Sequence, residues 1–257
     1  RYTIAVGAVG RDGIQSYYSE PCAALVVVAP SSDSRNNIIT SYSDDDDECA
    51  NTFGGTSAAC PMVSGTVALC LEANPELTWR DVQGVLIDSA VKTDPTDSDW
   101  YSNAAGKHVN HKYGFGRINA TGAVDTASKW VNLPTTVHLL DSHALSVSSH
   151  IPDRGLGTFS TSWTCSYSFI VEHVEILVDI SHAHRGQLNI QLTSPQGTIS
   201  TLAETHGDNN PDYAGWKFMT IRNWGENSQG TWQLTITDGS SGTTGTLNAW
   251  QLKIYTH

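Results

Sequence analysis

Positive charge is scarce in this sequence. Its 257 residues hold 14 Lys and Arg against 26 Asp and Glu, so the formal net charge is −12. Proteins that bind nucleic acid usually carry a basic patch or stripe, so this balance argues against nucleic acid as a partner. Long apolar runs are also lacking, and we expect no membrane segment in this chain. The chain opens at Arg1 within an apolar strand, without a signal segment, so we expect a piece of a longer product.

Cysteine occurs five times and never in the Cys-x-x-Cys spacing of structural zinc sites, which argues against such a site. Cys60 and Cys70 fall on one expected helix, about 15 Å apart at a rise of 1.5 Å per residue, which is too far for a disulfide. Cys22 and Cys49 fall in expected loops and are better disulfide candidates. Because the count is odd, at least one cysteine lacks a partner within this chain.

The stretch 53–62, Phe-Gly-Gly-Thr-Ser-Ala-Ala-Cys-Pro-Met, is the strongest functional signal. Its glycines permit a tight turn, and the apolar run 62–71 indicates a buried helix, so Ser57 falls at or just before the first helical turn. Unpaired N–H groups at a helix start can stabilise an oxyanion beside a nucleophilic serine. Pro61 also fits, because it leaves the Ser57 carbonyl without its usual helical partner. The alternative is a loop followed by an ordinary serine cap.

Short apolar runs predict that the first half is an α/β domain with a parallel sheet. The continuous runs at 3–9 and 25–29 are typical of buried parallel strands. Thr78, with Asp81 three residues later, forms a capping box before a helix that ends near Ser89. A further strand is expected at 38–42 and a third helix at 120–130.

Several polar groups invite a functional interpretation. The acidic run 44–48 is interpreted as a solvated loop, because it lacks the spaced pattern of a calcium loop. Asn119-Ala120-Thr121 is a glycosylation sequon, which has meaning only in a secreted protein. Two histidine pairs are interpreted as loop or turn residues rather than metal ligands. They are His108 with His111, and His182 with His184.

The sequence changes character after a linker at 131–136. Apolar and polar residues then alternate in short runs between turns, which predicts an antiparallel β sandwich or jelly roll. We therefore expect an α/β domain at 1–131 and an all-β domain at 137–257, with most tryptophans in the core or at a domain interface rather than in a binding platform. The runs are 174–180, 187–193, 231–237 and 247–254, and the tryptophans are Trp163, Trp216, Trp224 and Trp250.

A base for Ser57 is missing from the preceding sequence. A nucleophilic serine needs a base within hydrogen-bond reach and usually a carboxylate that orients it. The first histidine of the chain is His108. Either the base and acid precede Arg1, or a later histidine serves in another arrangement. We expect the first case, because the strand at 3–9 has no preceding fold to join.

The stretch around Ser57 resembles the nucleophile segment of subtilisin-type serine proteases. Longer motifs extend the resemblance to kexin and furin, the proprotein convertases, and the second half resembles their P domain. The motifs in the first half are 71–83 and 109–116, and those in the second are 172–174, 185–188, 192–198, 216–219, 224–227 and 230–232.

This resemblance implies a calcium-dependent serine endopeptidase of the secretory pathway that cuts precursor proteins after paired basic residues. Ser57 matches the nucleophile, and Glu20 matches a calcium ligand near the substrate pocket. Cys22 and Cys49 match cysteines whose disulfide partners lie upstream, and Cys165 matches a family cysteine with no partner nearby. The base, the orienting acid and the oxyanion-hole asparagine belong to the missing N-terminal half of the catalytic domain, so the chain alone is expected to be inactive.

Some residues depart from the family pattern. Cys60 and Cys70 replace small or polar residues and are interpreted as buried apolar fillers. From the residues alone, Glu20 is an exposed loop carboxylate. A second hypothesis therefore stays open, in which the β sandwich is a binding or structural module and the α/β part is an inert protease remnant.

Overall fold

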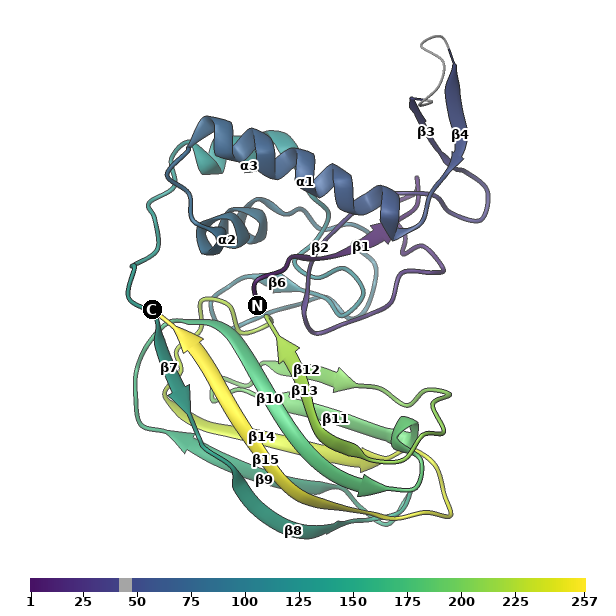
Figure 1. Cartoon of the computed structure of the whole chain (residues 1–257), viewed down its shortest axis with the longest axis vertical. Coiled ribbons are helices and arrows are strands. Elements are labelled where there is room, and N and C mark those ends of the chain that lie inside the picture. Colours follow the sequence, from purple (N-terminus) through teal and green to yellow (C-terminus); the bar gives the residue numbers. More distant parts are fainter. Residues whose placement is uncertain (42–47) are drawn as a thin grey trace. The chain divides into compact units, whose positions relative to one another are not determined.

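The structure, a computed structural model, describes residues 1–41 and 48–257. It divides into two compact units (Figure 1). The first unit comprises Arg1–Ser102 and Gly106–Leu133, and the second comprises Asn103–Ala105 and Pro134–His257. Most of the acidic run, residues 44–47, lies outside the described residues.

A short parallel sheet forms the centre of the first unit. Strands β1 (Ala5–Val9) and β2 (Leu25–Pro30) pair in parallel, as their continuous apolar sequences predict. Both strands are largely buried, and the predicted parallel sheet is confirmed for this pair. Two hairpins complete the strands of the unit: β3 (Ile38–Ser41) with β4 (Cys49–Phe53), and β5 (Tyr101–Ser102) with β6 (His108–Val109).

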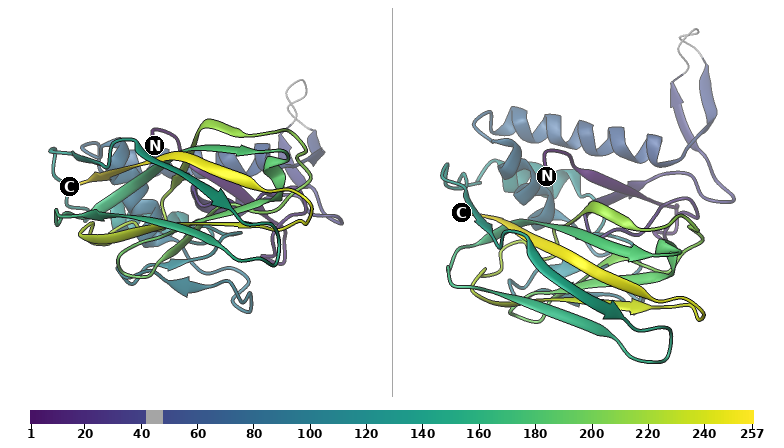
Figure 2. Two further views of the ribbon diagram at one scale, coloured as in Figure 1. Left: turned by 90° about the horizontal axis from the view of Figure 1, so that it is seen from below. Right: turned by 60° about the horizontal axis from the view of Figure 1, so that its bottom comes forward.

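Helix α1 (Thr56–Ala73) is buried on one face only. It packs against β1, β2 and α3, and Figure 2 shows it lying across β1. The expectation of a buried helix therefore holds for one face only, because 3.6-residue periodicity turns only one stripe toward the sheet. Cys70 is buried as predicted, but Cys60 is exposed. The buried positions are Ala58, Ala59, Val63, Thr66 and Cys70, and the large exposed apolar side chains are Met62, Leu69 and Leu71.

Length and composition alone would allow α1 to cross a membrane, so the expectation that no segment is long and apolar enough is wrong by that test. Core helices of soluble proteins pass the same test. In this structure 28% of the helix is buried, and α1 packs against β1, β2 and α3.

Helices α2 (Trp79–Ser89) and α3 (Ala120–Ala127) complete the first unit. The predicted capping box of Thr78 and Asp81 is present at the start of α2. Helix α3 ends three residues earlier than predicted. Beyond Ala127 the chain is no longer helical, and the indole N–H of Trp130 donates to the Asp81 carboxylate of α2 over 2.9 Å.

The second unit is an antiparallel β sandwich, as its alternating sequence predicts. One sheet has the order β13-β10-β15-β7, with β8 also paired to β15, and the other has the order β12-β11-β14-β9. The jelly-roll form of this sandwich stays a prediction. The strands of the first sheet are β7 (His138–Asp141), β8 (Leu145–Ile151), β10 (Val171–His182), β13 (Tyr213–Thr220) and β15 (Gly245–Thr256). Those of the second are β9 (Phe159–Cys165), β11 (Leu188–Thr193), β12 (Ile199–Ala203) and β14 (Gly230–Asp238), and a short 3₁₀ helix, η1 (Arg185–Gln187), precedes β11.

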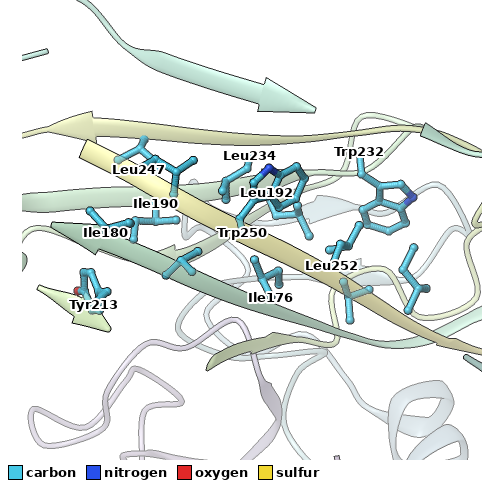
Figure 3. Packing of buried hydrophobic residues seen from close by; sticks show 14 of the residues in the cluster. Ile176, Ile180, Ile190, Leu192, Tyr213, Trp232, Leu234, Leu247, Trp250 and Leu252 are labelled. Atoms are coloured by element: carbon cyan, nitrogen blue, oxygen red, sulfur yellow. The ribbon is translucent and has the colours of Figure 1, made fainter. Parts of the chain in front are cut away.

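The core of the sandwich lies between its two sheets, where alternate side chains from both point inward (Figure 3). Trp232 and Trp250 are its largest members and are almost completely buried. Trp224 is buried as well, whereas Trp216 is 41% exposed. Trp163 is partly buried and packs against this core, so of the four tryptophans considered from the sequence only Trp216 is exposed. His182 is also buried, with its ring bonded to Asp238 over 3.1 Å, and is the last residue of β10 rather than part of a turn.

Candidate active site

Ser57 lies in the first turn of α1 and is exposed, as the sequence predicts. The helix is preceded by Gly55 as N-cap residue, with φ 75° and ψ 178°, and no side chain caps this end. Pro61 follows inside the helix, so the Ser57 carbonyl lacks the N–H that would normally bond to it. An exposed hydroxyl therefore stands at a helix start, a place that favours negative charge, where the N–H of Ala58 bonds to the Gly55 carbonyl over 3.0 Å.

Two serines after β2 hold the turn that precedes Ser57. Ser31 Oγ donates to the carbonyl oxygen of Gly55 over 2.6 Å. Ser32 Oγ accepts the N–H of Gly55 over 3.1 Å. Both polar groups of Gly55 are therefore engaged. The neighbouring Gly54 has no room for a side chain, because a Cβ there would overlap the Ser32 hydroxyl.

A second layer of hydrogen bonds orients Ser32. The hydroxyl of Tyr18 donates to the Ser32 carbonyl oxygen over 2.6 Å and lies 2.9 Å from Ser32 Oγ. Ser16 Oγ donates to the same carbonyl over 2.7 Å. Tyr18 and Ser16 come from the loop after β1, whereas Ser32 follows β2. Because β1 and β2 are parallel, their carboxyl ends meet at one edge, and this edge carries the turn that precedes Ser57.

The loop after β1 is itself fixed to the core of the unit. Ser19 Oγ accepts the N–H of Ala8 over 2.9 Å, and Gln15 Nε2 donates to the Ser19 carbonyl over 2.6 Å. Tyr113 accepts the Gln15 N–H over 3.2 Å and donates to Asp94 over 2.9 Å. Burial, together with the Asp94 carboxylate, raises the pKa of Tyr113 to about 12, so its phenol stays protonated and keeps donating.

No base reaches Ser57 within the part of the chain that the structure describes. Among residues 1–41 and 48–257, no side chain hydrogen bonds to Ser57 Oγ. His108, the first histidine, lies in β6 with its ring 5.5 Å from that of Trp100. Burial and nearby Lys92 lower the pKa of His108.

The other predicted site residues are found at separate places. Glu20 is exposed in the loop after β1, close in sequence to Tyr18. Among the described residues, no group of three or more His, Cys, Asp or Glu side chains could hold a metal. Glu20 itself offers one carboxylate of the kind that calcium binds.

The thiols and the sequon have the following positions. Cys22 and Cys49 are exposed and Cys165 is buried, and no two of the five cysteines form a disulfide with each other. The Asn119 side chain caps α3 by accepting the N–H of Gly122 over 3.1 Å. The assigned roles of these residues stay predictions.

Tyr18, Ser31 and Ser32 are site residues that sequence reasoning missed. A signal for them exists, because Ser31 and Ser32 directly follow a buried strand and Tyr18 lies in the loop after its parallel neighbour. Loops at the carboxyl ends of adjacent parallel strands converge, which would have placed the three residues together.

Comparisons with known proteins agree with this organisation. Residues 1–116 match the Subtilase family, and residues 171–254 match the Proprotein convertase P-domain. A solved structure, the serine protease of Aeromonas sobria, covers 98% of this chain and 57% of its own with a TM-score of 0.87. At 23% identity this likeness shows the fold alone.

Curated relatives are similar over most of this chain. PC3-like endoprotease variant B of Hydra vulgaris is 39% identical over 248 residues, which are 92% of this chain and 35% of that protein. Protease KEX1 of Kluyveromyces lactis is 37% identical over 264 residues, which are 99% of this chain and 34% of that protein. The chain thus spans about a third of the length of these relatives. Proprotein convertase subtilisin/kexin type 5 of Homo sapiens is 35% identical over 266 residues, which are 99% of this chain and 14% of that protein. Residues 1–116 belong to the subtilase family and residues 171–254 form a proprotein convertase P-domain.

Proposed function

We propose that Ser57 is the nucleophile of a subtilase-type serine endopeptidase that processes precursor proteins after paired basic residues. The observation that carries the proposal is the exposed Ser57 hydroxyl at the start of α1, behind a turn whose backbone is held on both sides. Such a hydroxyl can attack a peptide carbonyl, and the N–H groups of the first turn can stabilise the oxyanion that forms. The relatives named PC3-like endoprotease and Protease KEX1 support a protease, and the relative named proprotein convertase subtilisin/kexin type 5 supports precursor proteins as substrates.

The same proposal includes parts that this chain does not itself supply. The base, its orienting carboxylate and the oxyanion-hole asparagine come from the N-terminal half of the catalytic domain, so the chain alone does not cleave peptides. Glu20 contributes one ligand to a calcium ion, and Cys22 and Cys49 form disulfides with that half. The sequon at Asn119 is glycosylated, because the protein works in the secretory pathway.

Labelling with a fluorophosphonate, which modifies activated serines, tests the proposal. The full-length protein in calcium is compared with its Ser57→Ala variant and with a Ser64→Ala control. Ser64 lies on the same helix, where its hydroxyl donates to the Cys60 carbonyl over 3.2 Å. We expect labelling of the wild type and of Ser64→Ala, and none of Ser57→Ala or of the chain alone.

Two outcomes would contradict the proposal. Equal labelling of the wild type and Ser57→Ala would remove the assigned role of Ser57. Absence of labelling in every protein would favour the second candidate, a P-domain module joined to an inert protease remnant.

A further inference from the structure

The hydroxyl of Tyr18 is connected through one residue, Ser32, to Gly55 in the turn that precedes Ser57. Tyr18 donates to the Ser32 carbonyl, so the Ser32 hydroxyl, 2.9 Å away, can donate to the phenol oxygen. A lone pair of Ser32 Oγ then remains for the N–H of Gly55, 3.1 Å away. Tyr18 thus determines in which direction the Ser32 hydroxyl points, and Ser32 determines where Gly55 is held.

The serines of this relay are shielded from water. Ser16, Ser31 and Ser32 are 2%, 5% and 7% exposed. Hydrogen bonds in such surroundings are stronger than in water, and a polar group left without a partner there is costly. Burial by itself raises the pKa of the Tyr18 phenol, but hydrogen bonds from these serines and from the Gly55 backbone lower it overall.

The turn at Gly55 depends on these bonds for its shape. Its φ of 75° lies in the left-handed region, which a glycine reaches without strain but does not hold by itself. The bonds from Ser31 and Ser32 select this conformation, and Ser57 follows two residues later. Misplacing a reacting group by 1 Å costs about 100-fold in rate, so a small relaxation of the turn matters for the nucleophile.

We propose that Tyr18 is a positioning residue for Ser57: its hydroxyl orients Ser32, and Ser32 holds Gly55 so that the Ser57 hydroxyl is presented in one place. This inference rests on the proposed function, in which Ser57 is the nucleophile. Tyr18 acts on the turn and not on the substrate.

Hydrogen exchange of the Gly55 amide tests the relay without any need for activity. Tyr18→Phe keeps the ring and its edge-to-face contact with Tyr17, whose centroid is 5.0 Å away, and removes only the hydroxyl. Tyr17→Phe is the matched control, because Tyr17 is 83% exposed. We expect faster exchange of the Gly55 N–H in Tyr18→Phe and unchanged exchange in Tyr17→Phe. Unchanged exchange in Tyr18→Phe would overturn the inference.

The rate of fluorophosphonate labelling in the full-length protein tests the effect on Ser57. We expect Tyr18→Phe to lower the maximal labelling rate about tenfold and to leave the reagent concentration at half-maximal rate unchanged. If Tyr18 had a purely structural role, Tyr18→Phe would lower the melting temperature without a selective loss of the maximal labelling rate. If the Gly55 N–H exchanges faster in Tyr18→Phe but Ser57 is labelled at the wild-type rate, the inference is overturned and Ser57 remains the nucleophile.

Ser32→Ala provides a second variant, and faster exchange of the Gly55 N–H in it tests the step from Ser32 to Gly55 even if Tyr18→Phe does not fold, with unchanged exchange overturning the inference. Because Tyr18 acts through Ser32, the double variant should label no more slowly than Ser32→Ala alone, and additive losses would overturn the relay. If the wild type is not labelled at Ser57, the proposed function fails, and with it the positioning role. The exchange of Gly55 then shows separately whether the hydrogen-bond relay exists.

Discussion

The indole N–H of Trp130 donates to Oδ1 of Asp81 over 2.9 Å, which joins the segment after α3 to the first turn of α2. The N–H of Leu133 donates to the same oxygen over 2.7 Å. The other oxygen accepts from the Thr78 N–H over 2.8 Å and from the Thr78 hydroxyl over 2.5 Å. Asp81 has 0% exposure, so one buried carboxylate with four donors fixes two helices of the first unit.

We expect Asp81→Asn to lower the free energy of unfolding by about 2–3 kcal/mol, because an amide cannot accept all four bonds. Denaturant unfolding measures this loss. Asp88→Asn on the same helix is the control: its ion pair with Lys107 is about one third exposed, and we expect a change below about 1 kcal/mol. Similar losses in the two variants would contradict this role of Asp81.

The same carboxylate gives a pH dependence with a defined sign. Burial raises the pKa of Asp81, but the hydrogen bonds that it accepts lower it overall, below its usual value of 3.8. A lowered pKa in the folded state stabilises the fold above pH 3.8, and this contribution is lost as pH falls through the folded-state pKa. Stability measured between pH 5 and pH 2 should therefore fall more steeply in the wild type than in Asp81→Asn, and parallel curves would contradict the assignment.

Two core tryptophans of the second unit differ in one hydrogen bond. The indole N–H of Trp232 donates to the Ser228 carbonyl over 3.0 Å, whereas that of Trp250 has no partner among the described residues (Figure 3). Replacing each by Phe removes the same atoms from the same core. We expect Trp232→Phe to cost about 1–3 kcal/mol more than Trp250→Phe in denaturant unfolding. Equal costs would mean that the Trp232 bond adds little.

Gly54, in the turn before Ser57, and Gly65, within α1, differ in the space available for a side chain. A Cβ at Gly54 would overlap Ser32 Oγ, whereas a Cβ at Gly65 meets nothing within 4 Å. We expect Gly65→Ala to stabilise the fold by about 0.5–1 kcal/mol and leave Ser57 labelling unchanged. Gly54→Ala should displace Ser32 and slow labelling of the full-length protein at least tenfold, in line with the cost of small displacements. Normal labelling of Gly54→Ala would show that the turn tolerates a shift.

Glu226 in the second unit is 1% exposed and accepts three hydrogen bonds. The Ala104 N–H reaches Oε1 over 2.9 Å, the Thr198 hydroxyl reaches the same oxygen, and Asn223 Nδ2 reaches Oε2 over 2.9 Å. Glu226→Gln places an amide N–H against a donor, and we expect a loss of about 2–3 kcal/mol in unfolding free energy. Exposed Asp179→Asn should change it by less than about 0.5 kcal/mol. A Glu226→Gln variant as stable as the wild type would contradict the stabilising role of these three hydrogen bonds.

Local signals were sufficient for the parts of the fold that depend on neighbours in sequence. The glycines before Ser57 and the proline after it placed the serine at a helix start, and the spacing of Thr78 and Asp81 placed the start of α2. Alternation revealed β11, β14 and β15 because one face of each strand is buried. These features need only a few consecutive residues for their physical cause.

Features that depend on distant contacts were not predicted. The apolar sequence of α1 does not tell how many of its faces find a partner, and Leu69 and Met62 proved exposed. The early end of α3 depends on the Trp130 bond to Asp81, which spans 49 residues. Tyr18 was missed because its partner Ser32 lies 14 residues away, across two strand ends.

Mapping the fluorophosphonate adduct by mass spectrometry tests the central claim most directly. The full-length protein is labelled in calcium and digested, and the modified residue is identified from the peptide that carries it. The account predicts one adduct, on Ser57, that forms more slowly in Tyr18→Phe. An adduct on a different serine, or a labelled protein in which Ser57 is unmodified, would contradict it.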